Sequence, residues 1–470
     1  KNKFYKNYLI KEWIKSGFIY WQKLQHKDGS FDEAYPNEKS LAATSFTSFY
    51  LGEAFLLIKD EFDINFISDI KKSFYKAGEW LCKNDETHGI LSNHLSAAAG
   101  ALTIIFKITN KNKYFDRSLF FLKKIFKHQS SEGWYEEYGG ADIGYQTHGC
   151  FYLARIWQLT KNDELFSSLE LSIKFLSNFI HPNLTIGGEY CSRNTNFYFP
   201  AAFEILAPYI NEAASIANFM HDSITNCENA SLNVVDAQNF CPLLNNYLYA
   251  SSNYASIKSI RKLPKDITGS YYFRHAGIFI KVTEKYYCIF SSSKGGVLKI
   301  YDKQTNQISY SDCGYWIKEN NSITISSQSF SLKNIVKISK KSITVKTPFV
   351  RTNQTTFTPL KFISFRLFNI IFGKNKQLAK IIKKILVKTL VSQRKVTDNS
   401  LTRKITFSDD QVKVEDLISL KNKELENNLI SDTKFSTIHM GSSRYFSIDE
   451  IYLKKLNSKN LKRIYIWKAS

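Results

Sequence analysis

The amino-acid sequence predicts a multidomain α+β protein with a helical first half and an antiparallel β second half. Apolar residues recur with a period of 3.6 residues in the first half and with a period of two in the second. A polar, mixed segment separates the two patterns. We therefore expect a helical domain at 1–225, a connecting segment at 226–262 and a basic antiparallel β domain at 263–470.

Composition and charge support this division. A hydrophobic content of 43% and an aromatic content of 15% describe a folded chain. The net charge of +22 is concentrated in the second half: residues 1–260 hold 25 Lys and Arg against 27 Asp and Glu, whereas residues 261–470 hold 39 against 15. A basic half favours a polyanionic partner, namely an acidic polysaccharide, a nucleic acid or an anionic membrane. A compositional bias toward lysine and asparagine is the alternative.

The cysteines and motifs exclude several classes of site. The seven cysteines are scattered, without C-x-x-C pairs or zinc-like spacing, and the chain has no phosphate-cradling glycine motif. We therefore expect neither a metal nor a cofactor. Reduced, scattered thiols favour a cytoplasmic location, or one peripheral to the membrane, over a periplasmic or secreted one. No segment reads as long enough and apolar enough to span a membrane.

The helical half contains eight apolar stretches at helical spacing. They are residues 8–24, 41–58, 67–81, 91–108, 115–126, 143–159, 165–180 and 201–219. Several are apolar on more than one face, as expected where helices pack in two layers.

Four loops between these helices form a loose internal repeat. Each places a glycine and an aromatic or aliphatic residue after a polar turn, at intervals of about 45 to 60 residues. The loops are residues 25–31, 84–90, 128–134 and 182–188. The spacing is typical of stacked helical hairpins. If the hairpins close into a ring, these loops meet at one end, where we expect the pocket.

The β half reads as short strands joined by turns. The predicted strands are residues 271–281, 286–291, 297–301, 322–327, 342–347, 404–407, 413–418, 444–448 and 461–467, with turns at 294–296 and 319–321. One stretch differs: residues 320–397 contain 16 Lys and Arg and no Asp or Glu, and residues 360–391 read as a basic amphipathic helix. Such a helix either lies on an anionic membrane through Lys380, Lys383, Lys384 and Lys388, or covers the protein with a solvated lysine face. Nucleic acid is not expected, because the run lacks a recognition module.

Candidate functional residues gather at the loop–helix junctions. Residues 133–148 combine glycines, tyrosines, carboxylates and a histidine before the sixth helix, with Asp142 as its expected cap. Within them, Tyr145 and His148 are three residues apart and share a helical face. Asn93 and His94 begin the fourth helix and offer an amide beside a base.

Residues 188–195 supply a third group before the eighth helix. Arg193 with the neighbouring Asn194 suits a carboxylate or sulfate, because the guanidinium fork binds such groups with two hydrogen bonds. The β half adds His275, which we expect in its first strand. Together these residues suit the removal of a carbon-bound proton beside a neutralised carboxylate.

These pieces resemble the heparinase II/III-like polysaccharide lyases, together with the alginate lyases and related uronate epimerases. The resemblance is carried by Asn93-His94, by residues 136–145, by residues 188–204 and by Arg274-His275-Ala276-Gly277. It covers nearly the whole chain through short motifs. It implies an N-terminal incomplete α/α toroid followed by an antiparallel β-sandwich domain, acting on an acidic polysaccharide.

Residue by residue, the resemblance implies three catalytic positions: His94 as the base, Tyr145 as the catalytic tyrosine and His275 as a histidine supplied by the β domain. It implies that Asn93 neutralises the substrate carboxylate and that Arg193 binds it. The expected substrate-binding set is completed by Asn194, Tyr138, Glu189 and His148. Tyr138 competes with Tyr145 for the tyrosine role. The basic helix and Cys191, which stands where a glycine is expected, depart from the family pattern.

Three readings of function follow. The first is a lyase that cleaves a uronate-containing polysaccharide by β-elimination, and the second is an epimerase that shares its first step. The third is a non-catalytic glycan-binding or membrane-associated assembly protein. A glycoside hydrolase remains a further alternative, with its paired carboxylates drawn from Asp28, Asp32, Glu136 and Asp142.

Overall fold

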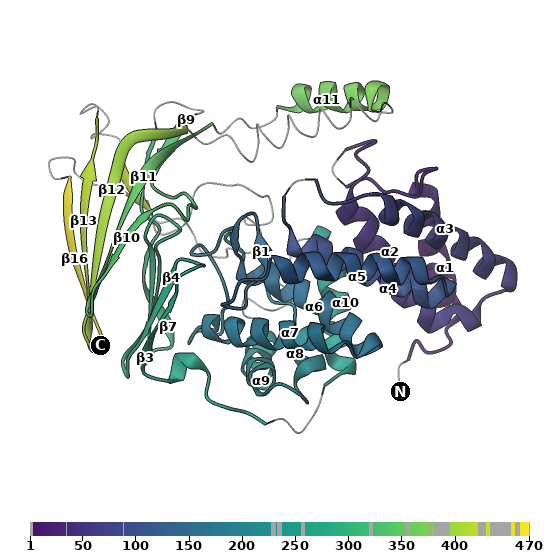
Figure 1. Ribbon diagram of the computed structural model, residues 1–470, viewed down its shortest axis with the longest axis horizontal. Helices are drawn as coiled ribbons and strands as arrows, with labels where there is room; N and C mark the ends of the chain where they lie inside the picture. The colour runs from purple at the N-terminus through teal and green to yellow at the C-terminus, as the bar shows by residue number, and fades with distance from the viewer. Residues whose placement is uncertain are drawn as a thin grey trace. The chain divides into compact units, whose positions relative to one another are not determined.

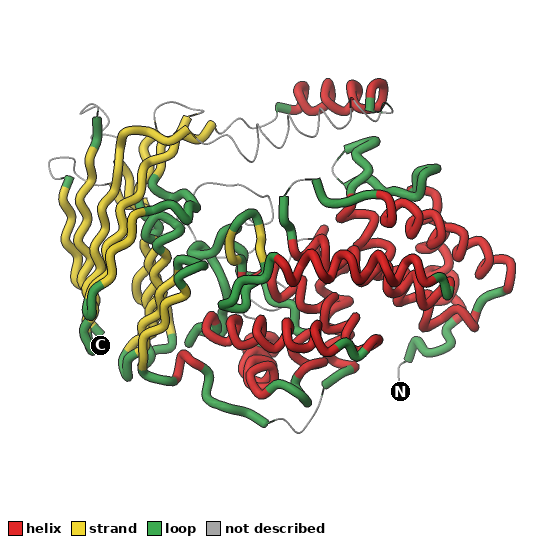
Figure 2. Tube along the Cα trace, viewed as in Figure 1, coloured by secondary structure: helices red, strands yellow, loops and turns green. Residues whose placement is uncertain are grey.

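The computed structural model divides the chain into two compact units (Figure 1). Unit 1 comprises residues 1–127, 155–161 and 357–386, and unit 2 comprises residues 128–154, 162–356 and 387–470. The structure describes residues 3–33, 35–87, 89–226, 232, 237–254, 259–318, 323–353, 358–373, 375, 378, 395–421, 429–432, 453–455 and 461–469. Figure 2 shows helices along the first half of the chain and strands along most of the second, which confirms the predicted α+β class.

Unit 1 is helical. Its helices are α1 (Tyr8–Leu24), α2 (Leu41–Ile58), α3 (Ile64–Lys83), α4 (Ser92–Thr109), α5 (Asn112–Lys127) and α11 (Pro359–Phe372). Helix α4 is central, since it packs against α2, α3 and α5. Its small residues allow close approach, and Gly52 of α2 faces Ile104 so closely that a Cβ on Gly52 would lie 2.5 Å from the Ile104 Cγ2 atom.

Helix α2 corrects the prediction that no segment is apolar enough to span a membrane. By length and composition, Leu41–Glu61 meets that test, with a mean hydropathy of 1.4. Half of this stretch is buried within the protein, however. One of its buried side chains is Glu53, whose carboxylate accepts two hydrogen bonds from Arg155 at 2.8 and 3.0 Å. Buried core helices pass the same test, and the ion pair indicates that α2 is one of them.

The predicted loop repeat is present as a shared backbone turn in three loops. In each turn, the N–H of the first residue donates to the carbonyl of the residue four positions later. The N–H of the residue three positions later donates to the carbonyl of that first residue. These bonds join His26 with Ser30 and Gly29, Ser130 with Trp134 and Gly133, and His181 with Thr185 and Leu184, at 2.9 to 3.2 Å.

Two of the three turns share a further contact. Gln25 donates to the Gly29 carbonyl at 3.2 Å and to Ser73 at 2.9 Å, and Gln129 donates in the same way to Gly133 at 3.3 Å and Ser168 at 2.9 Å. Gly29 and Gly133 have φ of 98° and 103°, which only glycine adopts freely. The repeat is therefore a repeat of hydrogen bonds as well as of residue types.

The helices of unit 2 are α7 (Asp163–Leu176), α8 (Ala201–Leu206), α9 (Asn211–Thr225) and α10 (Ala237–Ser252), together with the first part of α6 (Ile143–Thr160), whose last residues belong to unit 1. The single helix predicted at 201–219 is wrong, because the chain breaks between α8 and α9 at Ala207-Pro208, where proline lacks the N–H that would continue the helix. Helix α10 lies inside the predicted connecting segment, and Pro242 together with its asparagines masked the helical pattern.

The β half of unit 2 contains two antiparallel sheets. The five-stranded sheet runs in the order β3-β4-β5-β6-β7, and the larger one in the order β15-β14-β8-β9-β11-β12-β13-β16, with β10 paired to β11. Their strands are β3 (Gly269–Phe273), β4 (Ile278–Val282), β5 (Tyr286–Ser291), β6 (Val297–Asp302), β7 (Gln307–Asp312), β8 (Tyr315–Lys318), β9 (Ile323–Ser326), β10 (Ile335–Ile338), β11 (Ser342–Asn353), β12 (Lys395–Phe407), β13 (Gln411–Ser419), β14 (Leu429–Asp432), β15 (Leu453–Lys455) and β16 (Lys462–Lys468). A short hairpin of β1 (Glu136–Glu137) and β2 (Gly140–Ala141) precedes α6.

The two large sheets share one apolar core, so they form a sandwich. Tyr286 and Phe290 of β5 and Ile300 of β6 pack with Val345 of β11 and Val414 of β13. This confirms the predicted antiparallel sandwich.

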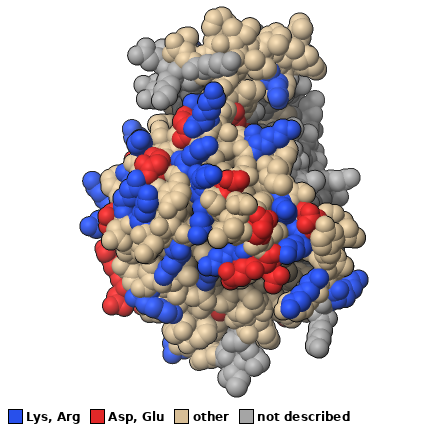
Figure 3. All heavy atoms as spheres, turned by 90° about the vertical axis from the view of Figure 1, so that its right-hand side faces the viewer, with Lys and Arg blue, Asp and Glu red and all other residues tan. Residues whose placement is uncertain are grey.

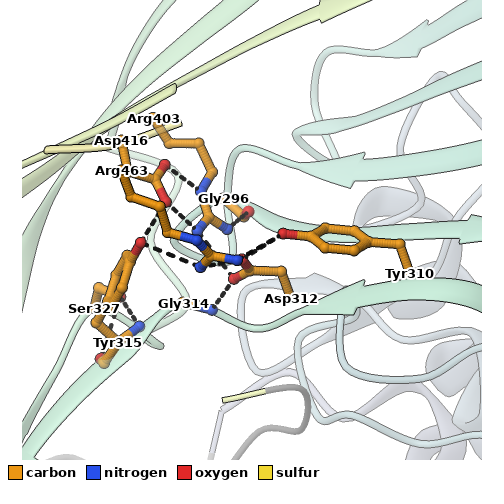
Figure 4. A network of polar contacts seen from close by, with 9 residues as sticks. All are labelled: Gly296, Tyr310, Asp312, Gly314, Tyr315, Ser327, Arg403, Asp416 and Arg463. Carbon is orange, nitrogen blue, oxygen red and sulfur yellow. Dashed lines mark hydrogen bonds and ion pairs between the residues drawn. The ribbon is translucent and has the colours of Figure 1, made fainter. Parts of the chain in front are cut away.

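A charged network lies inside this sandwich (Figure 4). Arg403, which is fully buried, donates to both carboxylate oxygens of Asp416 at 2.8 and 2.7 Å and lies 2.9 Å from Asp312. Arg463 pairs with the other oxygen of Asp312 at 3.0 Å. Arg403 also donates to the Gly296 carbonyl at 2.8 Å. The network therefore joins β7, β12, β13 and β16 to the turn at 294–296.

Several predicted strands change in detail. The strand expected at 271–281 is two strands, β3 and β4, with a turn at 274–277 in which Gly277 has φ of 69°. His275 therefore lies in a turn and not in a strand, which corrects its predicted position. Strands β7, β8, β10, β14 and β15 were not predicted. The predicted strand at 444–448 and turn at 319–321 lie outside the described residues, as do Lys380, Lys383, Lys384 and Lys388 of the predicted basic helix, of which α11 is the described part.

Candidate active site

The start of α6 is built around the buried carboxylate of Asp142. One of its oxygens accepts the Tyr145 N–H at 3.1 Å, which confirms the predicted helix cap, and it also accepts the Thr195 hydroxyl. The other oxygen accepts the Arg193 N–H at 2.9 Å. Burial raises the pKa of Asp142. This one carboxylate thus fixes the loop that bears Arg193 against the helix that bears Tyr145.

Arg193 is enclosed by the two predicted tyrosines. Its guanidinium carbon lies 3.8 Å from the ring centroid of Tyr145 and 4.9 Å from that of Tyr138, within the range of cation–π attraction. Its Nη1 atom lies 3.5 Å from a carboxylate oxygen of Glu137. Only 6% of Arg193 is exposed. Burial disfavours its charge, but Tyr145 and Glu137 outweigh burial and raise the pKa of Arg193, so it is a permanent buried cation.

The β-sandwich holds this loop at two points. Lys294, in the turn fixed by Arg403, donates to the Ser192 carbonyl at 2.9 Å. Lys299 of β6 lies 2.5 Å from the Glu189 carboxylate, and Asn194 in the same loop takes the left-handed conformation, with φ of 62°, that asparagine tolerates. The predicted binding residue Glu189 is therefore engaged with a lysine of unit 2.

His181 contacts Tyr190 of the loop at 188–195, and it was not singled out from the sequence. Its two ring nitrogens lie 3.1 Å from the Tyr301 hydroxyl and 2.9 Å from the Tyr190 hydroxyl. Burial lowers the pKa of His181, so the ring is neutral. The sequence signal was its place directly before the repeated loop at 182–188, and its partner Tyr301 lies 120 residues away in the chain.

His148 lies in an aromatic cluster. Its Nε2 atom is 2.8 Å from the Tyr152 hydroxyl, and its ring stacks on Phe199 with centroids 4.1 Å apart. Tyr145 packs edge-on against Phe197, which contacts Phe199 in turn. The face shared by Tyr145 and His148, predicted from their spacing, is thus covered by residues 197–199.

His275 lies on the β3–β4 turn, which a glutamate of the helical part holds in place. Glu132 accepts the backbone N–H groups of His275 and Ala276 at 2.8 and 3.0 Å and the indole N–H of Trp134 at 3.0 Å. The Nδ1 atom of His275 lies 3.4 Å from the hydroxyls of Ser130 and Ser131. The sequence did not single out Glu132, because its role is visible only once the turn packs beside it.

Asn93 and His94 lie in unit 1, in the first turn of α4. The Nδ1 atom of His94 is 2.7 Å from a carboxylate oxygen of Glu86, and its ring meets Phe46 edge-on. Asn93 is 1% exposed. A carboxylate on one ring nitrogen fixes the tautomer of a histidine and leaves the other nitrogen for chemistry. Glu86 is a third residue that the sequence did not single out, although it lies in a repeated loop.

A cavity of about 540 Å³ in unit 1 reaches Glu86. Among the described residues, its lining contains the carboxylates of Asp28, Glu38, Glu79, Asp85 and Glu86 and the lysines Lys39 and Lys83.

The four carboxylates considered for hydrolysis all have structural partners. Asp28 pairs with Lys39 at 2.6 Å, Asp32 with His26 at 2.9 Å and Glu136 with His128 at 3.1 Å, while Asp142 caps α6. Within the described ranges, no three His, Cys, Asp or Glu side chains gather as metal ligands.

The predicted site residues thus fall into three groups. Tyr138, Tyr145 and Arg193 are in contact in unit 2. His275 belongs to the Glu132 group of the same unit, and Asn93 and His94 belong to the Glu86 group of unit 1. Each group contains a carboxylate that orients it, and each side chain suits a proton transfer or the binding of an anion.

Comparison with known proteins finds one family model and several solved structures. Residues 12–199 match the family model of the ulvan lyase N-terminal domain. Among solved structures, chondroitin AC lyase of Streptomyces coelicolor A3 matches with a TM-score of 0.55 at 8% identity, over 89% of this chain and 59% of that one. A Paenibacillus xanthan lyase matches with a TM-score of 0.52 at 10% identity, over 91% of this chain and 40% of that one.

These matches define the fold. The chain spans about three fifths or less of the length of these solved lyases. No curated protein sequence matches it significantly. The helical part followed by antiparallel sheets is the architecture that the resemblance implied, and the family match covers the stretch that contains Asn93, His94 and Tyr145. Residues 12–199 are thus similar to the ulvan lyase N-terminal domain, and the chain as a whole has the fold of these solved lyases.

Proposed function

We propose that this protein is a polysaccharide lyase that cleaves a uronate-containing polysaccharide by β-elimination. The observation that carries the proposal is the buried Arg193 guanidinium held 3.8 Å from the ring centroid of Tyr145. It provides a fixed positive charge beside a phenol at the start of one helix, in a chain whose residues 12–199 match an ulvan lyase domain. A phenol that can give or take a proton beside a permanent cation suits an elimination next to a carboxylate.

The proposed roles follow from the groups. Arg193 neutralises the uronate carboxylate, so that negative charge can develop as an enediolate when the adjacent C–H bond breaks. His94, oriented by Glu86, is the proposed base, and His275 supplies a second imidazole. Tyr145 gives its proton to the glycosidic oxygen as the C–O bond breaks. A carbon–carbon double bond forms. The base has gained the carbon-bound proton, and Tyr145 has lost its hydroxyl proton to the leaving oxygen.

Formation of the carbon–carbon double bond in the product provides the test. Incubation with ulvan, chondroitin sulfate, xanthan, heparan sulfate and alginate is expected to raise the ultraviolet absorbance of an unsaturated uronate with at least one of them. Tyr145→Phe removes one hydroxyl and should lower kcat by at least about 10²-fold with an unchanged melting temperature.

Two further tyrosine variants complete this test. Tyr209→Phe removes an exposed hydroxyl elsewhere and serves as the control. Tyr138→Phe tests the competing tyrosine. Retained activity in Tyr145→Phe, or no absorbance rise with any of these polymers, would contradict the proposal.

A uronate epimerase would abstract the same proton as the lyase. Incorporation of deuterium from heavy water distinguishes the two activities. In heavy water, a lyase yields shorter unsaturated chains. Deuterium entering a polymer of unchanged length would instead identify the epimerase.

Helix α11 favours a second candidate function, association with an anionic membrane surface. Figure 3 shows mostly uncharged side chains where α11 lies, and acidic and basic residues intermixed over the face below. Eight of its large apolar side chains are exposed: Leu360, Phe362, Ile363, Leu367, Phe368, Ile370, Ile371 and Phe372. The surrounding sequence, residues 320–397, contains 16 Lys and Arg and no acidic residue. Apolar side chains within a basic stretch match an anionic lipid interface.

Vesicle flotation tests this candidate. Binding to vesicles of phosphatidylglycerol and phosphatidylcholine should exceed binding to phosphatidylcholine alone, and should fall with salt and in the double variant Phe368→Ser, Ile371→Ser. The quadruple replacement of Lys380, Lys383, Lys384 and Lys388 by Gln tests the basic part separately. Equal binding by both vesicle types, or by the variants and the parent, would exclude this mode of association.

A further inference from the structure

A polar cavity of about 600 Å³ opens in the β half of unit 2. It is bordered by β3, by the β3–β4 turn, by the end of β5 and by the segment that leads into β10. Its polar and aromatic lining residues are Tyr272, Arg274, Ser292, Ser293, Ser331 and Asn334. Its volume falls within the range of about 300 to 1,000 Å³ typical of small-ligand pockets.

The charge of the lining favours an anion. Among the described lining residues, Arg274 is charged and none is an Asp or Glu. Among the described residues, Arg274 forms no ion pair. Glu132, which holds the turn that bears Arg274, already accepts the N–H groups of His275, Ala276 and Trp134 with its two oxygens. An arginine without a protein carboxylate is suited to bind a carboxylate or sulfate with two hydrogen bonds.

The remaining lining residues suit a sugar. Tyr272 is partly exposed and offers an aromatic face to the C–H side of a pyranose. The amide nitrogen of Asn334 donates to the Ser292 carbonyl at 2.8 Å, while its amide oxygen is buried without a hydrogen-bond partner among the described residues. That oxygen is an acceptor for a sugar hydroxyl, because a buried acceptor left unpaired is costly.

The cavity wall is held rigid by backbone contacts. Ser331 donates its N–H to the Ser293 carbonyl at 2.7 Å, and the Ser293 hydroxyl donates to the Ala276 carbonyl at 2.8 Å. Gly277 lies so close to Ser293 that a Cβ would approach its side chain to 2.6 Å. Such preorganisation lowers the entropic cost of binding.

We propose that this cavity is a subsite for one acidic sugar of the polysaccharide, with the sugar anion on Arg274, its ring on Tyr272 and a hydroxyl on Asn334. The inference rests on the proposed function, because Arg274 is the residue before His275, and it adds a specificity site that the catalytic proposal does not contain. The anion is either a uronate carboxylate or a sulfate ester, which present the same chemistry to an arginine.

Calorimetric titration tests the subsite in the Tyr145→Phe background, in which we expect turnover to be strongly reduced. The probes are an unsulfated chondroitin hexasaccharide, its carboxyl-reduced counterpart and a chondroitin sulfate hexasaccharide. Arg274→Gln should weaken binding of the acidic hexasaccharides by about tenfold or more. Lys285→Gln, which removes an exposed charge from the same sheet outside the cavity, should leave it unchanged.

The pattern across probes separates the sources of the anion. A loss in Arg274→Gln for both acidic hexasaccharides supports recognition of a carboxylate, and a loss for the sulfated one alone supports recognition of a sulfate. Equal affinity of Arg274→Gln and its parent for both, or equal affinity of the parent for the carboxyl-reduced sugar and both acidic ones, would overturn the subsite. A chain that lacks lyase activity but shows the Arg274 effect would refute the proposed reaction and keep the subsite.

Discussion

At the scale of single residues, the predicted chemistry-bearing side chains are each held by a carboxylate, and of these carboxylates the sequence indicated only Asp142, as a helix cap. Asp142 holds both Tyr145 and Arg193 through their backbone, Glu132 holds the turn of His275, and Glu86 contacts His94. These carboxylates are acceptors and not the reacting groups. Their function is to fix the orientation of the residues that are proposed to transfer protons.

The contact between Glu86 and His94 leads to a prediction. Glu86→Gln replaces an obligate acceptor by an amide that can donate to Nδ1, which favours the opposite tautomer of His94. We expect kcat to fall at least about tenfold with little change in KM. Steady-state kinetics on the polymer that is cleaved measures this.

The neighbouring carboxylate provides the control. Asp85→Asn removes a charge that pairs with Lys124 at 2.9 Å and should leave kcat unchanged. If Glu86→Gln and Asp85→Asn behave alike, Glu86 does not position the base.

At the scale of elements, the loop at 188–195 depends on the sandwich for its shape. The turn at 294–296 is held by Arg403 through Gly296, and its Lys294 holds Ser192, next to Arg193. The charged network of Figure 4 is thus connected to the candidate site through two hydrogen bonds. A substitution in the network should therefore lower the stability of the sandwich and also disturb the position of the loop that bears Arg193.

Asp312 is the position at which this connection is best tested. Burial alone would raise its pKa, but Arg403 and Arg463 outweigh burial and lower the pKa of Asp312. A lowered native pKa contributes stability above about pH 4, which is lost as the pH falls through that native value. Asp312→Asn should cost about 3 to 5 kcal/mol at pH 7, since it leaves a buried arginine partly unpaired. Its melting temperature should also fall less steeply than that of the parent between pH 5 and pH 3.

Thermal unfolding followed by circular dichroism at several pH values measures both effects. Asp398→Asn, which removes a surface carboxylate paired with Lys421, serves as the control and should melt like the parent. A parent-like pH dependence in Asp312→Asn would show that the network does not titrate as argued.

At the scale of the whole molecule, the charge is unevenly distributed along the chain. The net charge of +22 arises entirely after residue 260, while the first 260 residues are nearly balanced. A basic half attracts polyanions over a distance set by the ionic strength, with a Debye length of about 10 Å at 0.1 M salt and about 3 Å at 1 M.

Salt dependence of binding follows from this charge. The affinity of the Tyr145→Phe variant for the uronate polymer that the parent cleaves should fall roughly tenfold or more between 0.1 and 1 M sodium chloride. Binding can be followed by calorimetry, with a neutral glucan as the comparison polymer. An affinity for the acidic polymer that does not change with salt would show that recognition does not use the basic half.

Hydrophobic periodicity was sufficient to predict many of the helices and strands, because the patterns of helices and strands are local in the sequence. The stretches at 8–24, 41–58 and 143–159 became helices within one or two residues of their predicted ends. It failed where a proline or a short turn interrupts a continuing pattern. Pro208 separates α8 from α9. The turn at 274–277 separates β3 from β4, although apolar and polar residues alternate on both sides of it. The predicted domain limits at 225 and 263 remain predictions.

The sequence by itself determined the class of fold, the repeat of the loops and the candidate side chains Asn93, His94, Tyr145 and Arg193, because each rests on residue type and short-range spacing. Only the tertiary structure decided which of them are in contact. Arg193 meets Tyr138 and Tyr145, His94 meets Glu86, and a cavity forms beside Arg274. Such contacts join residues far apart in the chain, and they depend on packing that no local pattern encodes.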